Sequence, residues 1–212
     1  MKSMILPEGI RNVIFDFGGV LFEIDYELPA IAFEKLGFPQ FRSFYTQAAQ
    51  NPMFDLLETG KVDNQAFLDF LHEFVPNASR EQVLHAWNVI LLRIWTEEVE
   101  FVNALRNSGV RTFLLSNTNA IHVAEFERMI ADTMDFDVFQ GAFEKIYYSN
   151  VIGIKKPYPE TFLKVCEWNE LLPSETLFID DSLQHVEGAR RAGLSAYHLK
   201  PGERVSDFFK PH

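Results

Sequence analysis

The sequence predicts an α/β protein built on a doubly wound parallel sheet, with a small helical bundle inserted after the first strand. Short apolar runs alternate with helical patterns over most of the chain, and this order is typical of parallel strands joined by right-handed crossovers. One long region contains helical patterns alone. The 212 residues, 47% of them hydrophobic, are enough for one ordinary domain that carries a small insertion.

Four apolar runs rich in β-branched and aromatic residues are the expected strands. Because these runs do not alternate with polar residues, they suit a sheet that helices cover on both faces. They are NVIFDF at 12–17, RTFLLS at 111–116, KIYYS at 145–149 and TLFID at 176–180. Helical patterns follow or separate the later runs, at 97–109, 119–132, 158–172 and 182–193. Glycine ends the first and last of these helices.

The inserted block lies between the first strand and the second half of the chain. Its helical patterns cover 27–37, 41–50, 64–74 and 79–95, with glycine and proline at the breaks. We expect a core domain formed by residues 1–25 and 97–212, and a helical cap domain formed by residues 26–96. Ligands of open α/β sheets bind at the carboxyl edge of the strands, so a bundle placed there would cover a site.

Charge and composition exclude several classes of protein. The formal net charge of -11 would repel a nucleic-acid backbone. No apolar stretch reaches the length of a membrane span, and the amino end does not resemble a secretory signal. We therefore expect a cytoplasmic protein without nucleic-acid or membrane partners. The single cysteine, Cys166, lies in a helical pattern and is interpreted as a core thiol rather than a nucleophile.

Polar residues end three of the predicted strands. These are Asp16, Ser116 and the pair Asp180-Asp181. Lys156 lies before a proline, shortly after the remaining predicted strand at 145–149. Each has a structural explanation by itself, because acids and hydroxyls also form turns and cap helices and most lysines are solvated. A parallel sheet would bring them to one edge, where several carboxylates require a cation. Mg²⁺, which prefers oxygen ligands, is the predicted cofactor.

The same residues form four motifs that resemble those of the haloacid dehalogenase-like hydrolase superfamily. The motifs are DFGGVL, LLSN, IKKP and FIDDS, and the inserted helices resemble the family's cap. Within the superfamily the chain is most similar to bacterial phosphatases such as α-D-glucose-1-phosphate phosphatase, and more distantly to the amino-terminal phosphatase domain of epoxide hydrolases. The resemblance implies a Rossmann-like haloacid dehalogenase core.

The resemblance also implies roles for individual residues. Asp16 would be the nucleophile that forms an aspartyl-phosphate, and Lys156 would balance charge. Phosphoryl oxygens would be held by the Ser116 hydroxyl, the backbone N–H of Asn117 and the turn at Gly18 and Gly19. The ligands of Mg²⁺ would be Asp16, the Gly18 carbonyl, Asp180 and Asp181, with Asp181 the first choice for direct ligation over Asp180.

Substrate contacts in this family come from the cap. The segment LLETGKVDNQAF at 56–67 is expected to be a loop that reaches the site, with Glu58, Lys61 and Asp63 as sugar or phosphate contacts. Several cap phenylalanines could indicate an apolar substrate, but their spacing also fits helix packing, which we favour. The six considered are Phe41, Phe44, Phe54, Phe67, Phe70 and Phe74. His122 and His185 follow motif residues and could line the mouth of the site, but surface or helix-packing roles are favoured for both.

Gly18 departs from the family pattern, since most phosphatases of the superfamily carry a second Asp there as general acid and base. Three alternatives follow: a substrate with a good leaving group, a substitute acid among Glu23, Asp25, Glu58 and Asp63, or a catalytically idle binder of phosphorylated ligands. A phosphomutase or a 2-haloacid dehalogenase fits less well. The expected function is a Mg²⁺-dependent phosphatase for a small metabolite such as glucose-1-phosphate, acting as a monomer or weak homodimer.

Overall fold

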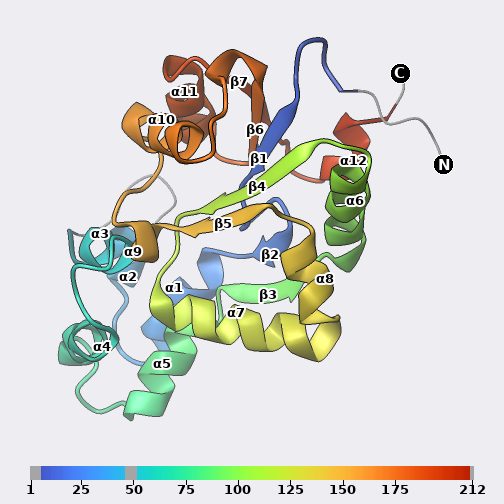
Figure 1. Cartoon of the computed structure of the whole chain (residues 1–212). Coiled ribbons are helices and arrows are strands. Elements are labelled where there is room, and N and C mark those ends of the chain that lie inside the picture. Colours follow the sequence, from blue (N-terminus) through green and yellow to red (C-terminus); the bar gives the residue numbers. More distant parts are fainter. Residues whose placement is uncertain (1–5, 46–51, 211–212) are drawn as a thin grey trace.

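A parallel sheet forms the centre of the molecule (Figure 1). The computed structural model describes residues 6–45 and 52–210. All neighbouring strands of this five-stranded sheet are parallel, and their order is β5-β4-β1-β6-β7. The strands are β1 (Asn12–Phe15), β4 (Arg111–Ser116), β5 (Lys145–Tyr148), β6 (Thr176–Asp180) and β7 (Ser195–His198). The predicted α/β fold class and the four predicted strands are confirmed.

Residues of each central strand alternate between two hydrophobic cores. In β1, Val13 and Phe15 face one core while Ile14 faces the other. The first core is covered by α6 (Thr96–Asn107), α7 (Ala120–Thr133), α8 (Phe136–Gly141) and α12 (Val205–Phe208). The second is covered by α10 (Pro159–Trp168) and α11 (Leu183–Arg191). Because both faces are buried there, the middles of the central strands β1, β4 and β6 are apolar, and this explains why their sequence shows no alternation.

The inserted helices have a hydrophobic core of their own. They are α1 (Glu27–Lys35), α2 (Phe41–Phe44), α3 (Pro52–Glu58), α4 (Asn64–Glu73) and α5 (Arg80–Asn88). The six cap phenylalanines pack within this bundle, three of them fully buried: Phe41, Phe54 and Phe67. The packing interpretation is therefore confirmed. In the described ranges, no helix has the length and apolar character needed to span a membrane.

The helix predicted over 79–95 is wrong in its second half. Helix α5 ends at Asn88, and β3 (Leu91–Ile94) pairs antiparallel with β2 (Phe22–Ile24). A short apolar run fits a buried helix or a strand equally well, and its partner strand here lies about 70 residues away in the chain. The edge strand β7 was also not predicted, since its residues are polar and only partly buried.

Two further cap predictions are corrected in part. The helix expected over 41–50 stops at Phe44, because Tyr45 is extended, and residues 46–50 lie outside the described part of the chain. The loop expected over 56–67 begins as the last turn of α3 and ends inside α4. Only the residues between these helices form a turn. Two short elements complete the chain, α9 (Ser149–Ile152) and the 3-10 helix η1 (Pro173–Glu175).

Candidate active site

The carboxyl edge of the sheet collects the polar residues that follow the strands. Phe15 of β1 lies opposite Leu114 of β4 and Ile179 of β6. The next residues along these strands, among them Asp16 and Asp180, therefore meet at the same edge. The backbone N–H of Asp16 donates to the carbonyl of Ile179 at 2.9 Å, which continues the ladder to the edge.

Lys156 joins two buried carboxylates at this edge. Its Nζ lies 2.7 Å from Oδ1 of Asp16 and 2.7 Å from Oδ2 of Asp180. Lys156 and Asp180 are fully buried, and Asp16 is 7% exposed. Buried charges of this kind are costly unless they are paired. One lysine thus serves two carboxylates, and one negative charge is left over.

The two carboxylates differ in pKa. Burial and repulsion from Asp180 raise the pKa of Asp16 well above its ordinary value, although Lys156 acts to lower it. Burial also acts to raise the pKa of Asp180, but Lys156 and His185 outweigh it, so this pKa lies below the ordinary value. The carboxylate of Asp180 accepts hydrogen bonds from the Lys156 ammonium group, the Ser182 backbone N–H and the His185 ring. Hydrogen bonds to an ionised carboxylate favour the charged form.

The turn after Asp16 packs against Asp181. Gly19 has a φ of +75°, and a Cβ at this position would lie 2.4 Å from Oδ2 of Asp181. Only glycine fits there, because a side chain would be strained and would displace the carboxylate. A Cβ on Gly18 would lie 2.8 Å from Cδ1 of Ile24. The position that lacks the family's second acid therefore faces an apolar side chain of β2.

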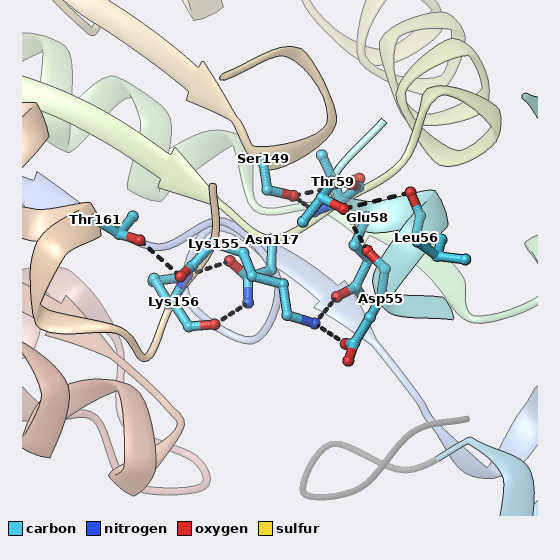
Figure 2. Close-up of polar contacts among 10 residues, drawn as sticks. Asp55, Leu56, Glu58, Thr59, Asn117, Ser149, Lys155, Lys156 and Thr161 are labelled. Carbon is cyan, nitrogen blue, oxygen red and sulfur yellow. Dashed lines mark hydrogen bonds and ion pairs between the residues drawn. The ribbon is translucent and has the colours of Figure 1, made fainter. Parts of the chain in front are cut away.

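Asn117 fixes the backbone of Lys156 from both sides. Its Oδ1 accepts from the Lys156 backbone N–H at 3.0 Å, and its Nδ2 donates to the Lys156 carbonyl at 2.9 Å (Figure 2). Ser149 similarly exchanges hydrogen bonds with the backbone of Thr118. The loop after β4 is thereby tied to the loop that carries Lys156, which holds the lysine side chain in place.

A polar cavity of about 310 Å³ opens above this edge. Its floor includes Lys156, Asn117 and His185, and its upper wall comes from the cap. The full lining is Tyr26, Tyr45, Asp55, Glu58, Asn117, Thr118, Asn119, His122, Lys155, Lys156, Pro157, Tyr158, Gln184 and His185. A cavity of this size suits a small molecule, and it lies next to the paired carboxylates.

Both histidines line the cavity. His185 is buried, and its Nδ1 lies 3.0 Å from Oδ2 of Asp180. His122 is buried on the cavity wall and stacks on Trp87 with ring centroids 4.6 Å apart. Burial lowers the pKa of both, that of His122 to about 4. A surface role is wrong for both, the contact of His122 with Trp87 is a packing role, and the alternative that both histidines line the mouth of the site agrees with the cavity lining.

Among the predicted cap contacts, Glu58 lines the cavity and Lys61 does not. Glu58 is buried and contacts Nζ of Lys155 at 2.7 Å, and Asp55 contacts the same atom at 2.5 Å (Figure 2). Lys61 is exposed, and Asp63 is the N-cap of α4.

The other candidates for a substitute acid are also engaged outside the cavity. Glu23 pairs with Arg93 across the β2–β3 ribbon, and Asp25 accepts from the backbone of Glu27. Of the four candidates, Glu58 alone belongs to the cavity lining. Cys166 is buried, and burial raises the pKa of its thiol to about 11, in agreement with a core role.

The donor set at the sheet edge suits a divalent cation. Ligand atoms of Asp16, Asp180 and His185 all lie within 4.8 Å of one another. Carboxylate oxygens are the ligands that Mg²⁺ prefers, and the two acids carry one more negative charge than Lys156 neutralises. His185 was not among the predicted ligands. Asp181, the first choice for direct ligation, lies beside the Gly19 turn.

Comparison with known proteins identifies the family. Residues 10–193 match the haloacid dehalogenase-like hydrolases. The chain belongs to this family. It is 29% identical over 199 residues to a D-ribitol-5-phosphate phosphatase from Bacteroides thetaiotaomicron, which covers 91% of this chain and 93% of that protein. It is also 28% identical to a sesquiterpene phosphatase from Aspergillus oryzae, with 89% of each chain covered.

A solved structure of the haloacid dehalogenase family has the same fold as this chain. It is a mutant of a Bacteroides thetaiotaomicron enzyme of this family in complex with magnesium and inorganic phosphate. It superimposes with a TM-score of 0.85 at 32% sequence identity, and covers 95% of this chain and 100% of that one. The predicted resemblance to the haloacid dehalogenase-like hydrolases is thus confirmed, and the chain is an enzyme of the phosphatase type within this family.

Sequence reasoning gave Lys155 no role of its own, and kept His185 at the site only as an alternative, in this haloacid dehalogenase-like enzyme. Lys155 directly precedes Lys156 in the loop before α10, where the chain enters a turn. One lysine contacts the core acids while the other contacts the cap acids. His185 lies in the first turn of the helix that follows β6. Polar residues in the first turn of such a helix lie close to the carboxyl edge of the sheet, so its position in the sequence could have indicated that His185 belongs to the site.

Proposed function

We propose that this phosphatase hydrolyses the phosphate ester of a small hydroxylated metabolite, a sugar or sugar-alcohol phosphate, with Mg²⁺ and an aspartyl-phosphate on Asp16. The observation that carries the proposal is the convergence of Asp16 and Asp180 on Lys156 beside a polar cavity. The cytoplasm is the proposed location, and the proposed assembly is a monomer or weak homodimer.

Asp16 is the proposed nucleophile because its carboxylate ends a central strand and lies at the site edge. Attack of the carboxylate on phosphorus breaks the bond to the leaving oxygen, which departs as the alcohol after taking up a proton, and leaves an acyl phosphate on Asp16. Water then hydrolyses this mixed anhydride to free Asp16 and inorganic phosphate, so that one displacement becomes two. Lys156 keeps its positive charge beside Asp16, because Asp16 and Asp180 raise the pKa of this fully buried lysine although burial acts to lower it. The hydroxyl of Ser116 and the backbone N–H of Asn117 are the proposed donors to phosphoryl oxygens.

Asp16, the Gly18 carbonyl, Asp180 and Asp181 are the residues proposed to hold Mg²⁺. The cation would supply the positive charge that two carboxylates and a phosphate dianion require. Support for this assignment comes from the unbalanced charge at Lys156 and from the tight packing of Asp181 on Gly19. His185 orients Asp180 through its ring nitrogen.

The leaving group is proposed to be one that departs without a strong acid. Gly18 supplies no carboxyl group, and Ile24 occupies the adjacent space. An anomeric phosphate such as glucose-1-phosphate fits this condition. One relative that matches over most of the chain is a D-ribitol-5-phosphate phosphatase, which adds a sugar-alcohol phosphate to the candidates, although its primary alcohol leaves less readily than an anomeric oxygen. An apolar alcohol is less suited to the polar lining of the cavity.

Phosphate release tests the proposal. Purified protein is assayed with an aryl phosphate, glucose-1-phosphate and ribitol-5-phosphate, with Mg²⁺ and with a chelator. Asp16→Asn is expected to lose activity by roughly 10³-fold or more, because it removes the nucleophile. Asp132→Asn, on the exposed face of α7, is the matched control and is expected to remain active. Absence of turnover in the wild type, or full activity in Asp16→Asn, would contradict the mechanism.

A further inference from the structure

The end of the cavity that faces the cap carries a second cluster of charges. Nζ of Lys155 contacts Oδ1 of Asp55 at 2.5 Å and Oε2 of Glu58 at 2.7 Å (Figure 2). All three residues line the cavity. The side chains of Lys155 and Glu58 are 13% and 9% exposed, whereas that of Asp55 is 57% exposed. Two acids and one lysine give this end a net negative charge.

Backbone packing holds these acids against the core. The turn after α3 contains Gly60, with a φ of +66°, and a Cβ there would lie 2.2 Å from the carbonyl oxygen of Asn150. The end of α3 therefore rests directly on α9 of the core. Lys155 is fixed in turn, because its carbonyl accepts a hydrogen bond from Thr161 at 2.7 Å (Figure 2). The acidic cluster is thus a built part of the cavity wall.

The remaining lining between the two lysines is polar and uncharged. It includes Tyr26, Tyr45, Asn119 and Gln184. His122 is neutral at pH 7, because burial lowers its pKa to about 4. These groups can exchange hydrogen bonds with hydroxyls, and ionised Glu58 can accept charge-assisted hydrogen bonds from them. They provide no cation to balance a second anionic group.

We infer that the Asp55–Glu58–Lys155 cluster makes the enzyme selective for neutral, hydroxylated leaving groups, and that it rejects phosphate esters whose leaving group carries a carboxylate. The inference rests on the proposed function, since the phosphate must first be placed at Asp16. A carboxylate at the cap end would meet Glu58 and Asp55 in a partly desolvated cavity, where solvent screens the repulsion only in part and less than in bulk water. A hydroxyl at the same place would donate to these acids. Glu58 is the main discriminating residue because it is the more buried of the two acids.

Two substrates that differ in one group test the inference. Ribitol-5-phosphate and 5-phosphoribonate have the same chain and the same phosphate, and only the latter replaces the terminal CH₂OH by a carboxylate. We expect kcat/KM to be at least about tenfold higher for ribitol-5-phosphate, the ratio that a modest charge repulsion produces. Glu58→Gln keeps the shape of the side chain and removes the charge. It is expected to reduce this ratio at least about threefold, mainly by raising kcat/KM for 5-phosphoribonate.

Matched variants separate this effect from a general change of charge. Glu73→Gln changes the same residue type on an exposed position of α4 and is expected to leave the ratio unchanged. Asp55→Asn, which removes the more exposed acid, is expected to reduce the ratio less than Glu58→Gln does. Both variants keep Lys155 paired with one remaining acid or both, so the fold is preserved.

The outcomes distinguish the inference from the proposed function. An aryl phosphate reports the chemistry at Asp16 without a sugar chain. Hydrolysis of the aryl phosphate combined with equal kcat/KM for the two matched substrates would overturn the inference and leave the proposed function standing. A ratio that Glu58→Gln does not change would also overturn it. Lack of all hydrolysis, the aryl phosphate included, would overturn both.

Discussion

At each end of the cavity, one of two adjacent lysines contacts two carboxylates. Lys156 contacts Asp16 and Asp180, both at 2.7 Å. Lys155 contacts the cap acids Asp55 and Glu58 at 2.5 and 2.7 Å. The difference is burial: the core cluster is excluded from solvent, whereas Asp55 in the cap cluster is 57% exposed.

Burial gives the two clusters different consequences. Two carboxylates that share one lysine in the core cannot be relieved by water, so they favour a further cation and form a place for chemistry. In the cap cluster, solvent screens part of the extra negative charge, so it persists without a cation. Such a cluster can influence which ligand enters without taking part in the reaction. The end of the cavity at Lys156 is therefore the proposed reacting end, and the end at Lys155 is the proposed selecting end.

The largest expected effect comes from removing the core lysine. Lys156→Met leaves Asp16 and Asp180 buried without their shared cation, and breaking a buried pair in this way costs about 3–5 kcal/mol. The free energy of unfolding, measured with urea, is expected to fall by this amount, and phosphatase activity is expected to disappear. Unchanged stability would show that the core cluster is not as buried in solution as its side-chain contacts indicate.

The neutral wall between the two ends gives a pH dependence. The pKa of His122 is lowered from 6.5 to about 4 by burial, so the unfolded chain binds this proton more readily than the folded protein. Stability is therefore full above about pH 6.5 and falls as the pH drops toward about 4. The total loss is about 3 kcal/mol, because a tenfold change in proton affinity corresponds to about 1.4 kcal/mol.

Urea unfolding of the wild type and of His122→Asn at several pH values in this window is the measurement. The variant is expected to lose stability less steeply as the pH falls. A residual slope is expected from His185, because burial lowers its pKa in the same direction. Parallel slopes for the two proteins would contradict a buried neutral His122.

Gly19 tests how closely the core end is packed. Its φ of +75° and the carboxylate of Asp181 at 2.4 Å from the Cβ position leave no room for a methyl group. Gly19→Ala is expected to cost about 2 kcal/mol of stability from backbone strain and displacement of Asp181. Because Asp181 is a proposed Mg²⁺ ligand, the variant is also expected to bind Mg²⁺ more weakly and to need a higher Mg²⁺ concentration for half-maximal activity. Gly37→Ala is the control, because its φ is also positive, +103°, but its Cβ would meet no atom within 4 Å.

The core fold and the acids at its edge could be predicted because their signals are local. A strand buried on both faces is an apolar run, and the polar residue that ends it lies at the sheet edge whatever the rest of the chain does. Asp16, Ser116 and Asp180 were identified in this way. The structure places Asp16 and Asp180 together on Lys156; their catalytic and metal-binding roles stay predictions.

The features that sequence reasoning missed depend on distant partners. Leu91–Ile94 forms a strand because β2 lies ready to pair with it, and no local pattern shows this. Lys155 and Asp55 are separated by 100 residues, so their contact required the cap to be placed over the core. The burial of His122 likewise depends on Trp87 of the cap helix α5. Tertiary contacts, and not local propensity, decided each of these.

The smallest expected effect is the loss of the cap lysine, and it closes the comparison with Lys156→Met. Lys155→Met leaves Asp55 free to turn toward water, and only Glu58 keeps a partly buried charge. The pair with the exposed Asp55 contributes about 1 kcal/mol or less, whereas Glu58, only 9% exposed, keeps its charge in a largely buried place. The free energy of unfolding is therefore expected to fall by about 1–2 kcal/mol, less than for Lys156→Met, in which two buried acids lose their cation. Activity toward an aryl phosphate should persist, since the core cluster is intact. If Lys155→Met were as destabilising as Lys156→Met, the cap cluster would have to be as buried as the core cluster. The proposed difference between a selecting end and a reacting end would then be contradicted.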